Sequence, residues 1–280
     1  MTDFEIAAKH ALAKYSPIAE ELTPLASQPD RQVFLAPQAK IILKAYTDGK
    51  ILEKEHTITQ KAERAGILVP HVMGIEVGNP TILVMEYING KPLNVDYPKA
   101  AKEAGTCLQR FHALGATPPF SGGQYSWAEF ISWWTQTEIE NCKKIHAFDK
   151  HVYDALHHTF NTFASTIADR PIVLLHGDLQ AAHILVDPHE DKFVGFLDFA
   201  DAQPGDPLMD IAVLSLWDTR LANLVLAGYS GIDNSTETQD ILSHYRLLRH
   251  VAEIPWLTAR GLTQQVDKNK KAIFDFLEKK

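Results

Sequence analysis

The sequence of 280 residues has little cysteine, no excess of basic side chains and no long apolar run. Its two cysteines, Cys107 and Cys142, are not at a metal-ligand spacing, so free thiols in a reducing compartment are the simplest interpretation. The formal net charge of -8 argues against a nucleic-acid-binding protein, which usually carries a basic footprint. No segment approaches the about 18 apolar residues of a membrane span, and the N-terminus lacks the pattern of a signal peptide. We therefore expect a cytoplasmic protein with neither a nucleic-acid nor a membrane partner.

What the chain does contain is the composition of an ordinary folded protein. Its hydrophobic content of 45% is typical of globular proteins, and its length allows one large domain or two lobes. There are no internal repeats and no low-complexity tracts. A net negative charge favours both solubility and the binding of cationic partners, so it does not distinguish between these two interpretations. The oligomeric state does not follow from the sequence.

The most informative stretch is His176-Gly177-Asp178 and the residues that follow it. Two short apolar runs, 184–187 and 193–199, flank the polar, Pro-containing segment 188–192, a pattern that predicts a β-hairpin. An antiparallel hairpin places the start of its first strand beside the end of its second. His183 should therefore lie next to Asp198, with Asp178 one tight loop away.

A buried loop that holds Asp178, His183 and Asp198 is costly unless a metal or a proton-transfer task uses these groups. Phosphoryl transfer needs such a set, because one carboxylate accepts the proton of the attacking hydroxyl and two further ligands hold Mg²⁺ against the phosphates. The alternative is that all three are polar groups at the end of a hairpin that satisfy backbone donors.

A second pair lies upstream. Lys44 sits inside the apolar run 41–45, where a lysine needs a partner or an anion. Helical spacing from Ile51 to Ala65 places Glu55 in the middle of an apolar stripe, where a carboxylate must be paired or protonated. We therefore expect a Lys44–Glu55 ion pair. The alternatives are an edge-strand lysine and a solvated helix charge.

Together these segments resemble the aminoglycoside phosphotransferase/choline kinase family, which has the protein-kinase-like fold. The resemblance rests on His176-Gly177-Asp178, the ligand position His183, Asp198-Phe199, and the later segment Gly205-Asp206-Pro207-Leu208-Met209-Asp210-Ile211-Ala212. It implies a bilobal α+β fold, with a small N-terminal antiparallel-sheet lobe over residues 1–88 and a larger, mostly helical C-terminal lobe over residues 89–280. Asp206 and Asp210 are expected to be structural.

The resemblance assigns roles to the residues of the hairpin. It implies that Asp178 is the catalytic base and that Asp198 is the principal ligand of Mg²⁺. His183 departs from the commoner asparagine of the family, although some antibiotic kinases carry histidine there. Mg²⁺ prefers oxygen ligands, so His183 either binds the metal as a neutral imidazole or hydrogen-bonds a phosphate or Asp178.

The resemblance also implies where the nucleotide binds. Lys44 and Glu55 correspond to the strand lysine and helix glutamate that position ATP phosphates in kinases. Backbone groups of Glu86 and Ile88 would hydrogen-bond the adenine edge, with Met85 at the back of the pocket. The alternative for this segment is a surface β-turn. The loop over the phosphates would be residues 27–30, which contain no glycine.

Several elements can be predicted around these motifs. Helices are expected at 1–20, 51–65, 100–114, 127–144, 150–168, 238–261 and 264–279, with another starting at Met209 and reaching Trp217, and a loop at 115–126. Strands are expected at 33–35, 39–46, 69–75 and 81–87. All five tryptophans lie in the C-terminal part, where they can accept an amine or quaternary ammonium by cation–π contact: Trp127, Trp133, Trp134, Trp217 and Trp256.

We therefore expect a kinase that uses ATP, with GTP as the alternative nucleotide, and Mg²⁺. Its partner would be a small molecule whose hydroxyl accepts the γ-phosphoryl group, such as an amine-bearing aminoglycoside. A choline, homoserine or sugar kinase of the same family stays open, as does a non-catalytic nucleotide-binding pseudokinase. A protein kinase is less favoured, because too few residues separate Asp198 from the helix near 209 for a typical activation loop.

Overall fold

The computed structural model describes residues 2–116, 120, 123–216 and 218–279. The chain forms two compact units, the first made of Met1–Leu114 with His176–Ala202 and the second of Gly115–Leu175 with Gln203–Lys280. The α+β class is confirmed, with an antiparallel sheet in the N-terminal part and mostly helices in the C-terminal part. The predicted division into residues 1–88 and 89–280 stays a prediction. None of the described helices is both long enough and apolar enough to cross a membrane.

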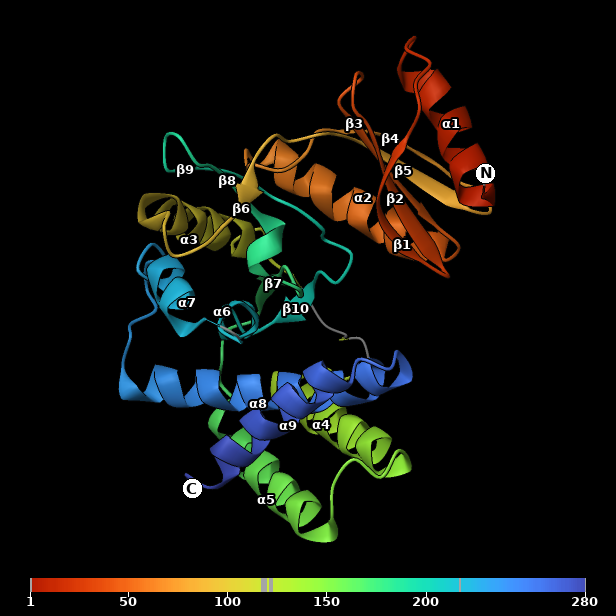
Figure 1. The fold of residues 1–280 in the computed structure, drawn as a ribbon. Helices are drawn as coiled ribbons and strands as arrows, with labels where there is room; N and C mark the ends of the chain where they lie inside the picture. Colours follow the sequence, from red (N-terminus) through yellow and green to blue (C-terminus); the bar gives the residue numbers. More distant parts are fainter. Residues whose placement is uncertain (1, 117–119, 121–122, 217, 280) are drawn as a thin grey trace. The chain divides into compact units, whose positions relative to one another are not determined.

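The first unit is built on a five-stranded antiparallel sheet with the strand order β1-β2-β3-β5-β4 (Figure 1). A short turn at residues 29–30 joins its first two strands, so the predicted loop 27–30 covers the end of β1 and this turn. The strands are β1 (Thr23–Gln28), β2 (Arg31–Ala36), β3 (Ile41–Tyr46), β4 (Val72–Glu76) and β5 (Thr81–Glu86).

Two helices cover the opposite faces of this sheet, α1 (Asp3–Tyr15) and α2 (Gly49–Arg64) (Figure 1). The alternation of β3 decides which residue faces which helix, because successive side chains of a strand point to opposite faces. Leu43 packs in the cluster around α1, whereas Ile42 and Tyr46 pack in the cluster around α2. Lys44 therefore points toward α2.

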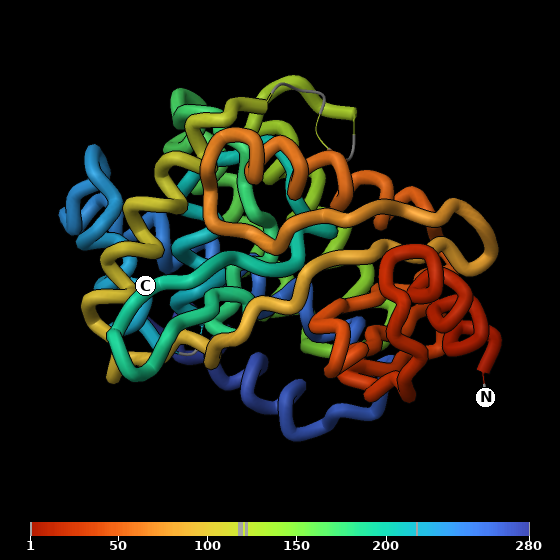
Figure 2. Tube along the Cα trace, turned by 90° about the horizontal axis from the view of Figure 1, so that it is seen from above, coloured from red at the N-terminus to blue at the C-terminus, as the bar shows by residue number. Residues whose placement is uncertain are grey.

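The second sheet of the first unit contains the predicted hairpin, β8 (Ile184–Asp187) and β9 (Lys192–Phe196), with the short strand β6 (Lys91–Pro92) beside it (Figure 2). The prediction of a hairpin is confirmed, but its second strand ends at Phe196 rather than at residue 199. Asp198 has a φ of 64°, which lies in the left-handed region and cannot belong to a strand.

Helix α3 (Pro98–His112) ties this hairpin to α2. Asp191, in the turn of the hairpin, accepts the backbone N–H groups of Lys99 and Ala100, both at 3.0 Å, at the start of α3. At the other end, Arg110 donates to the carbonyls of Ala65 and Gly66, at 3.3 and 3.1 Å, just after α2. Helix α3 thereby holds the two elements that carry the predicted site residues.

The second unit is mostly helical, with α8 in contact with α4, α5, α6 and α9. Its only described strands are β7 and β10, which pair with each other. The elements are α4 (Trp127–Lys144), α5 (Lys150–Thr166), β7 (Val173–Leu175), β10 (Gln203–Gly205), α6 (Leu208–Leu214), α7 (Thr219–Leu226), α8 (Thr236–Ala259) and α9 (Thr263–Leu277).

Several elements differ from the sequence predictions. The first helix ends at Tyr15 rather than at residue 20, because Pro17 has no N–H to continue it. Strand β1 was not predicted, since nearly all of its positions are exposed and it shows no apolar alternation. Strands β7 and β10 and helix α7 were also missed. Part of the predicted loop 115–126 (residues 117–119 and 121–122) and Trp217 lie outside the described residues.

Candidate active site

Lys44 lies between two carboxylates inside the first unit. Its Nζ is 2.6 Å from Oε1 of Glu55 and 3.0 Å from Oδ1 of Asp198. Lys44 and Glu55 are both buried, with 7% and 1% of their surface exposed, so the charges are largely removed from water. The predicted Lys44–Glu55 ion pair is present in the structure, and Asp198 extends it.

Lys44 and Asp198 hold each other ionised, whereas burial raises the pKa of Glu55 despite the nearby Lys44 ammonium. Burial alone would lower the pKa of Lys44, but the carboxylates of Glu55 and Asp198 outweigh it and raise that pKa above its ordinary value. Burial would likewise raise the pKa of Asp198, but the nearby Lys44 ammonium lowers it from 3.8 to about 2. At neutral pH the site therefore presents a cation and an anion side by side.

The backbone at Asp198 is held in an uncommon conformation. Its φ of 64° is rare outside glycine, and such residues are concentrated at functional sites. Lys44 joins this segment to α2, because its Nζ contacts both Asp198 and Glu55. Helix α2 therefore fixes the lysine, which in turn contacts Asp198.

His183 is the last residue of the short 3₁₀ helix η1 (Ala181–His183), directly before β8. Its Nδ1 is 2.7 Å from the carbonyl oxygen of Asp178, and because a carbonyl only accepts, Nδ1 carries the hydrogen. Its Nε2 lies 3.9 Å from Oδ2 of Asp198. In the neutral ring, Nε2 thus offers a lone pair beside a carboxylate oxygen, which is the arrangement that a cation can bridge.

Asp178 lies in the loop between β7 and η1, and its side chain is 22% exposed. Gln180 donates its side-chain amide to both carboxylate oxygens of Asp178, at 2.8 and 2.9 Å. The preceding Gly177 has a φ of 86°, and a Cβ there would lie 2.1 Å from the carbonyl oxygen of Asp201. Only glycine fits this position, so the loop can turn sharply enough to present Asp178.

His176 is a site residue whose role the sequence did not reveal. It is fully buried, and its Nε2 donates to the carbonyl of Leu197 at 2.8 Å. Its ring also stacks with that of His183, with the ring centres 6.0 Å apart. His176 thereby connects the loop that carries Asp178 to the segment that carries Asp198. The one sequence feature that could have indicated this role is the position of His176 directly before Gly177-Asp178.

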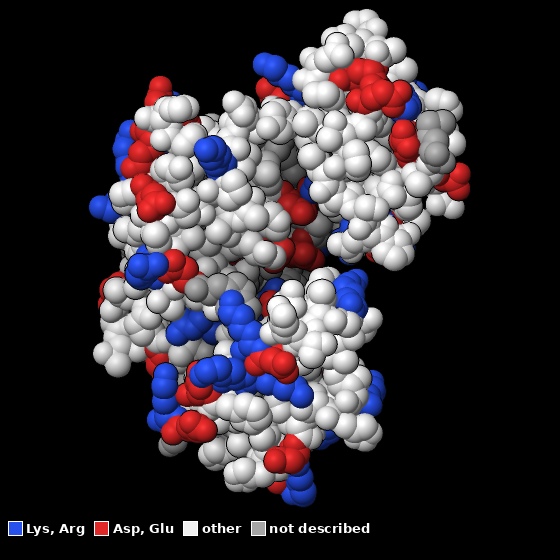
Figure 3. Space-filling view, viewed as in Figure 1, with Lys and Arg blue, Asp and Glu red and all other residues white. Residues whose placement is uncertain are grey.

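The structure brings Asp178, His183, Asp198, Lys44 and Glu55 together within the first unit. A space-filling view shows acidic side chains in a hollow of the surface (Figure 3). Among the described residues, no group of three or more His, Cys, Asp and Glu side chains is arranged to hold a metal ion. The predicted metal site therefore consists of the pair His183 and Asp198 alone.

Met85, Glu86 and Ile88 lie at and just after the end of β5. Met85 is buried in the cluster on the α2 face of the sheet, the face from which Lys44 projects, whereas Glu86 is exposed. The backbone N–H of Glu86 donates to the carbonyl oxygen of His71 at 2.9 Å. The backbone N–H of Tyr87 donates to the carbonyl oxygen of Lys40 at 2.8 Å. Ile88 follows the strand, and its N–H has no such backbone partner in the described chain.

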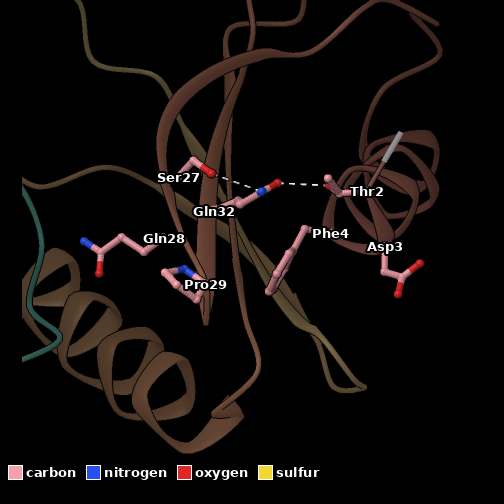
Figure 4. A pocket seen from close by; sticks show the side chains of 7 residues that line it. All are labelled: Thr2, Asp3, Phe4, Ser27, Gln28, Pro29 and Gln32. Carbon is pink, nitrogen blue, oxygen red and sulfur yellow. Dashed lines mark hydrogen bonds between the residues drawn. The ribbon is translucent and has the colours of Figure 1, made fainter. Parts of the chain in front are cut away.

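The turn predicted to cover the phosphates joins β1 to β2. Gln32 connects it to α1, because Gln32 donates to Ser27 at 3.2 Å and accepts from Thr2 at 3.1 Å (Figure 4). These residues border an open pocket of about 510 Å³. In the close-up, Gln28 points away from α1. The phosphate-covering role of residues 27–30 stays a prediction.

Asp206 lies in the second unit and serves its structure. Oδ1 accepts from Arg170 and from the backbone of Leu208, both at 3.0 Å, and Oδ2 accepts from Arg170 and from the Tyr245 hydroxyl, both at 2.8 Å. Tyr245 in turn accepts from Trp127 at 2.6 Å. Asp210 is also fully buried. The motif that contains both aspartates is therefore part of the core.

A sheet that carries Lys44, a helix that carries Glu55 and a hairpin that carries His183 and Asp198 are the arrangement of the protein-kinase-like fold. The chain belongs to the phosphotransferase enzyme family, whose sequence model it matches over residues 21–258. The resemblance stated from the motifs is thereby confirmed. No curated protein matches the chain significantly in sequence.

Solved structures of aminoglycoside phosphotransferases share the fold. The ADP-bound APH(2″)-Ib matches with a TM-score of 0.73 at 18% identity, over 97% of this chain and 98% of its own. The gentamicin complex of APH(2″)-IIa matches with a TM-score of 0.73 at 17% identity, over 98% and 97%. A thermostable APH(4)-Ia with ADP and hygromycin B matches with a TM-score of 0.75 at 15% identity, over 97% and 98%.

Proposed function

We propose that the chain is an ATP-dependent kinase that transfers the γ-phosphoryl group to a hydroxyl of a small, amine-bearing acceptor such as an aminoglycoside. The single observation that carries this proposal is the network in which Lys44 Nζ lies 2.6 Å from Glu55 and 3.0 Å from Asp198. A buried cation beside a carboxylate with a spare oxygen suits a triphosphate and its metal ion.

Asp198 and His183 would hold Mg²⁺. This ion commonly keeps several waters and takes only one or two protein ligands together with substrate phosphates, so a pair of ligands suffices. Oδ2 of Asp198 and Nε2 of His183, 3.9 Å apart, face each other and fit this need. When bound, the metal would neutralise charge that develops on the phosphates.

Each side chain of the proposed active site then has a separate role. Lys44, fixed by Glu55, holds the phosphates of the nucleotide in place. Asp178 orients the acceptor hydroxyl and takes its proton as the oxygen attacks the γ-phosphorus in line. The protein forms no covalent bond to the phosphoryl group in this reaction, so positioning and electrostatic stabilisation account for most of the rate enhancement.

The segment after β5 would bind the base of the nucleotide. The N–H of Ile88, which lacks a backbone partner among the described residues, can donate to the edge of adenine, and the carbonyl of Glu86 can accept from it. Met85 forms the buried wall behind. Guanine presents a different pattern of donors and acceptors, so ATP is the nucleotide proposed and GTP is the alternative to be tested.

An amine-bearing acceptor is supported by two observations. Structures of the same fold bind gentamicin and hygromycin B. The second unit of this chain also exposes aromatic rings, with Trp133 41% and Trp256 48% exposed, and Arg260 already lies 3.8 Å over the ring of Trp256. Exposed rings of this kind attract cations.

Replacing Asp178 with Asn tests the proposal. The variant should lose turnover by about 10²–10⁴-fold, the usual contribution of a general base, while its affinity for ATP·Mg²⁺ stays within about threefold of wild type. ADP formation would be measured with a panel of hydroxylated acceptors, aminoglycosides first, then choline, homoserine and sugars. Retained turnover in the variant would rule out the role given to Asp178.

The second candidate is a nucleotide-binding pseudokinase without activity. It is favoured by the glycine-free turn at residues 27–30 and by histidine at position 183. Steady ADP formation that requires both Mg²⁺ and Asp198 supports the kinase. Tight binding of ATP without any turnover, with water or with any acceptor of the panel, supports the pseudokinase.

A further inference from the structure

Gln180 is fixed beside Asp178 by its own backbone. Its N–H donates to the carbonyl of Asp178 at 2.8 Å, and its carbonyl accepts the N–H of His183 at 2.9 Å. Gln180 is thus held at the start of η1 from both sides. Because the backbone is fixed, the side chain can reach Asp178 with little loss of freedom.

The side-chain amide of Gln180 meets the carboxylate of Asp178 symmetrically. Nε2 lies 2.8 Å from Oδ1 and 2.9 Å from Oδ2, so one N–H of the amide is shared between the two oxygens. A hydrogen bond to an ionised carboxylate is among the stronger ones in proteins. The amide thus occupies the side of the carboxylate from which one hydroxyl could reach either oxygen, so a hydroxyl that approaches Asp178 from that side must displace it.

We propose that Gln180 is a positioning residue that occupies Asp178 until an acceptor hydroxyl displaces it, and so limits transfer of the phosphoryl group to water. This inference rests on the proposed function, in which Asp178 is the base. In the suppressed reaction, the oxygen of water bonds to the γ-phosphorus. The bond from that phosphorus to the bridging oxygen breaks, its electron pair leaves on ADP, and the proton of water goes to Asp178.

The acceptor and water differ in how well they can compete with the amide. A bound acceptor is held by its other contacts, so its hydroxyl reaches Asp178 at a high effective concentration. A water molecule has no such anchor and must displace Gln180 alone. Because the glutamine side chain is exposed, it can swing into solvent once an acceptor hydroxyl arrives.

Gln180→Met tests this inference, because methionine has similar length and no donor. With ATP and Mg²⁺ but no acceptor, the variant should form ADP about tenfold faster than wild type, with a KM for ATP within about twofold. The double variant with Asp178→Asn should fall back to the rate of Asp178→Asn alone. Gln264→Met, at an exposed glutamine in the first turn of α9, is the matched control and should behave as wild type.

A faster acceptor-free reaction is a result that mere structural damage does not produce. If the Gln180→Met variant hydrolyses ATP at the wild-type rate or more slowly, with an unchanged KM for ATP, the inference is overturned and the proposed function stays intact. Wild type that turns over no acceptor would instead contradict the proposed function. If the Gln180→Met variant does not fold, NMR offers a second test. The side-chain amide signals of Gln180 should shift between wild type and Asp178→Asn, and the absence of a shift would also overturn the inference.

Discussion

Asp198 in the first unit and Asp206 in the second unit each lie against a cation, but their surroundings differ. Asp206 is fully buried, and its two oxygens accept from Arg170, Tyr245 and the backbone of Leu208 at 2.8 to 3.0 Å. Asp198 lies 3.0 Å from Lys44, yet its buried Oδ1 makes no hydrogen bond of ordinary geometry in the described structure. Its side chain remains 34% exposed.

The difference separates a carboxylate that serves the structure from one that we propose serves the active site. Buried polar groups in proteins normally have their hydrogen-bonding capacity filled, as Asp206 does. A carboxylate that is left short of donors and placed in a left-handed backbone conformation is costly to the fold, and such features cluster where a ligand completes them. We therefore expect Asp206 to matter for stability and Asp198 for activity.

The largest effect should come from Asp198→Asn. Asparagine tolerates a positive φ, so the backbone at this position should be kept. Because the side chain loses its charge, turnover should fall by at least about 10²-fold, as it does when one preorganised electrostatic group is removed from other enzymes. Thermal melting would show whether the fold is kept, and a decrease in Tm of no more than about 5 °C is expected from the loss of the charge pair with Lys44.

A large loss of stability in Asp198→Asn, with activity falling only in proportion to the unfolded fraction, would contradict the comparison. ADP formation per folded molecule is therefore the quantity to measure. Asp201→Asn offers a control for a charge removed from the same segment, at an exposed aspartate.

The next effect is a loss of stability in Arg170→Leu. The guanidinium donates to both oxygens of Asp206, and breaking a buried pair on one side typically costs about 3–5 kcal/mol, since it leaves the other charge buried and uncompensated. Urea unfolding would measure the change. The catalytic constants of the folded protein should stay close to wild type, because this network lies within the second unit.

Arg220→Leu is the matched control. Arg220 also pairs with an aspartate, Asp218, at 3.2 Å, but its side chain is 77% exposed, and exposed ion pairs contribute little. Its urea midpoint should equal that of wild type. If Arg170→Leu were no less stable than Arg220→Leu, the structural role given to Asp206 would be wrong.

The smallest effect concerns pH. Lys44 lowers the pKa of Asp198 from 3.8 to about 2, so the folded state binds this proton less readily than the unfolded state. The stabilisation is present above pH about 4 and is lost as the pH falls through about 2. Carboxyl ¹³C NMR should show one signal titrating near pH 2 that is missing from Asp198→Asn. A signal titrating at the ordinary value for aspartate would refute the close charge pairing.

The sequence predicted those parts of the site that depend on local patterns. The hairpin followed from two apolar runs around a turn, and the Lys44–Glu55 pair followed from two lone charges in apolar surroundings. Asp198 lies two residues beyond Phe196, the last residue of β9, because its left-handed backbone cannot be read from the apolar run 193–199.

Other features depend on contacts that no local pattern encodes. Strand β1 is held by pairing with β2 rather than by an apolar face. Arg170 meets Asp206 across 36 positions of sequence, and His176 meets Leu197 across 21. The approach of Gln180 to Asp178 depends on the 3₁₀ turn that fixes its backbone, which the sequence alone did not predict.

The most direct test of the proposed site is a crystal structure of the chain with Mg²⁺ and a non-hydrolysable ATP analogue. The proposal predicts a metal ion about 2.0–2.1 Å from an oxygen of Asp198, the usual distance for Mg²⁺, with Lys44 against the phosphates and Asp178 facing the γ-phosphorus. A nucleotide bound elsewhere, or a metal ion that does not touch Asp198, would contradict it.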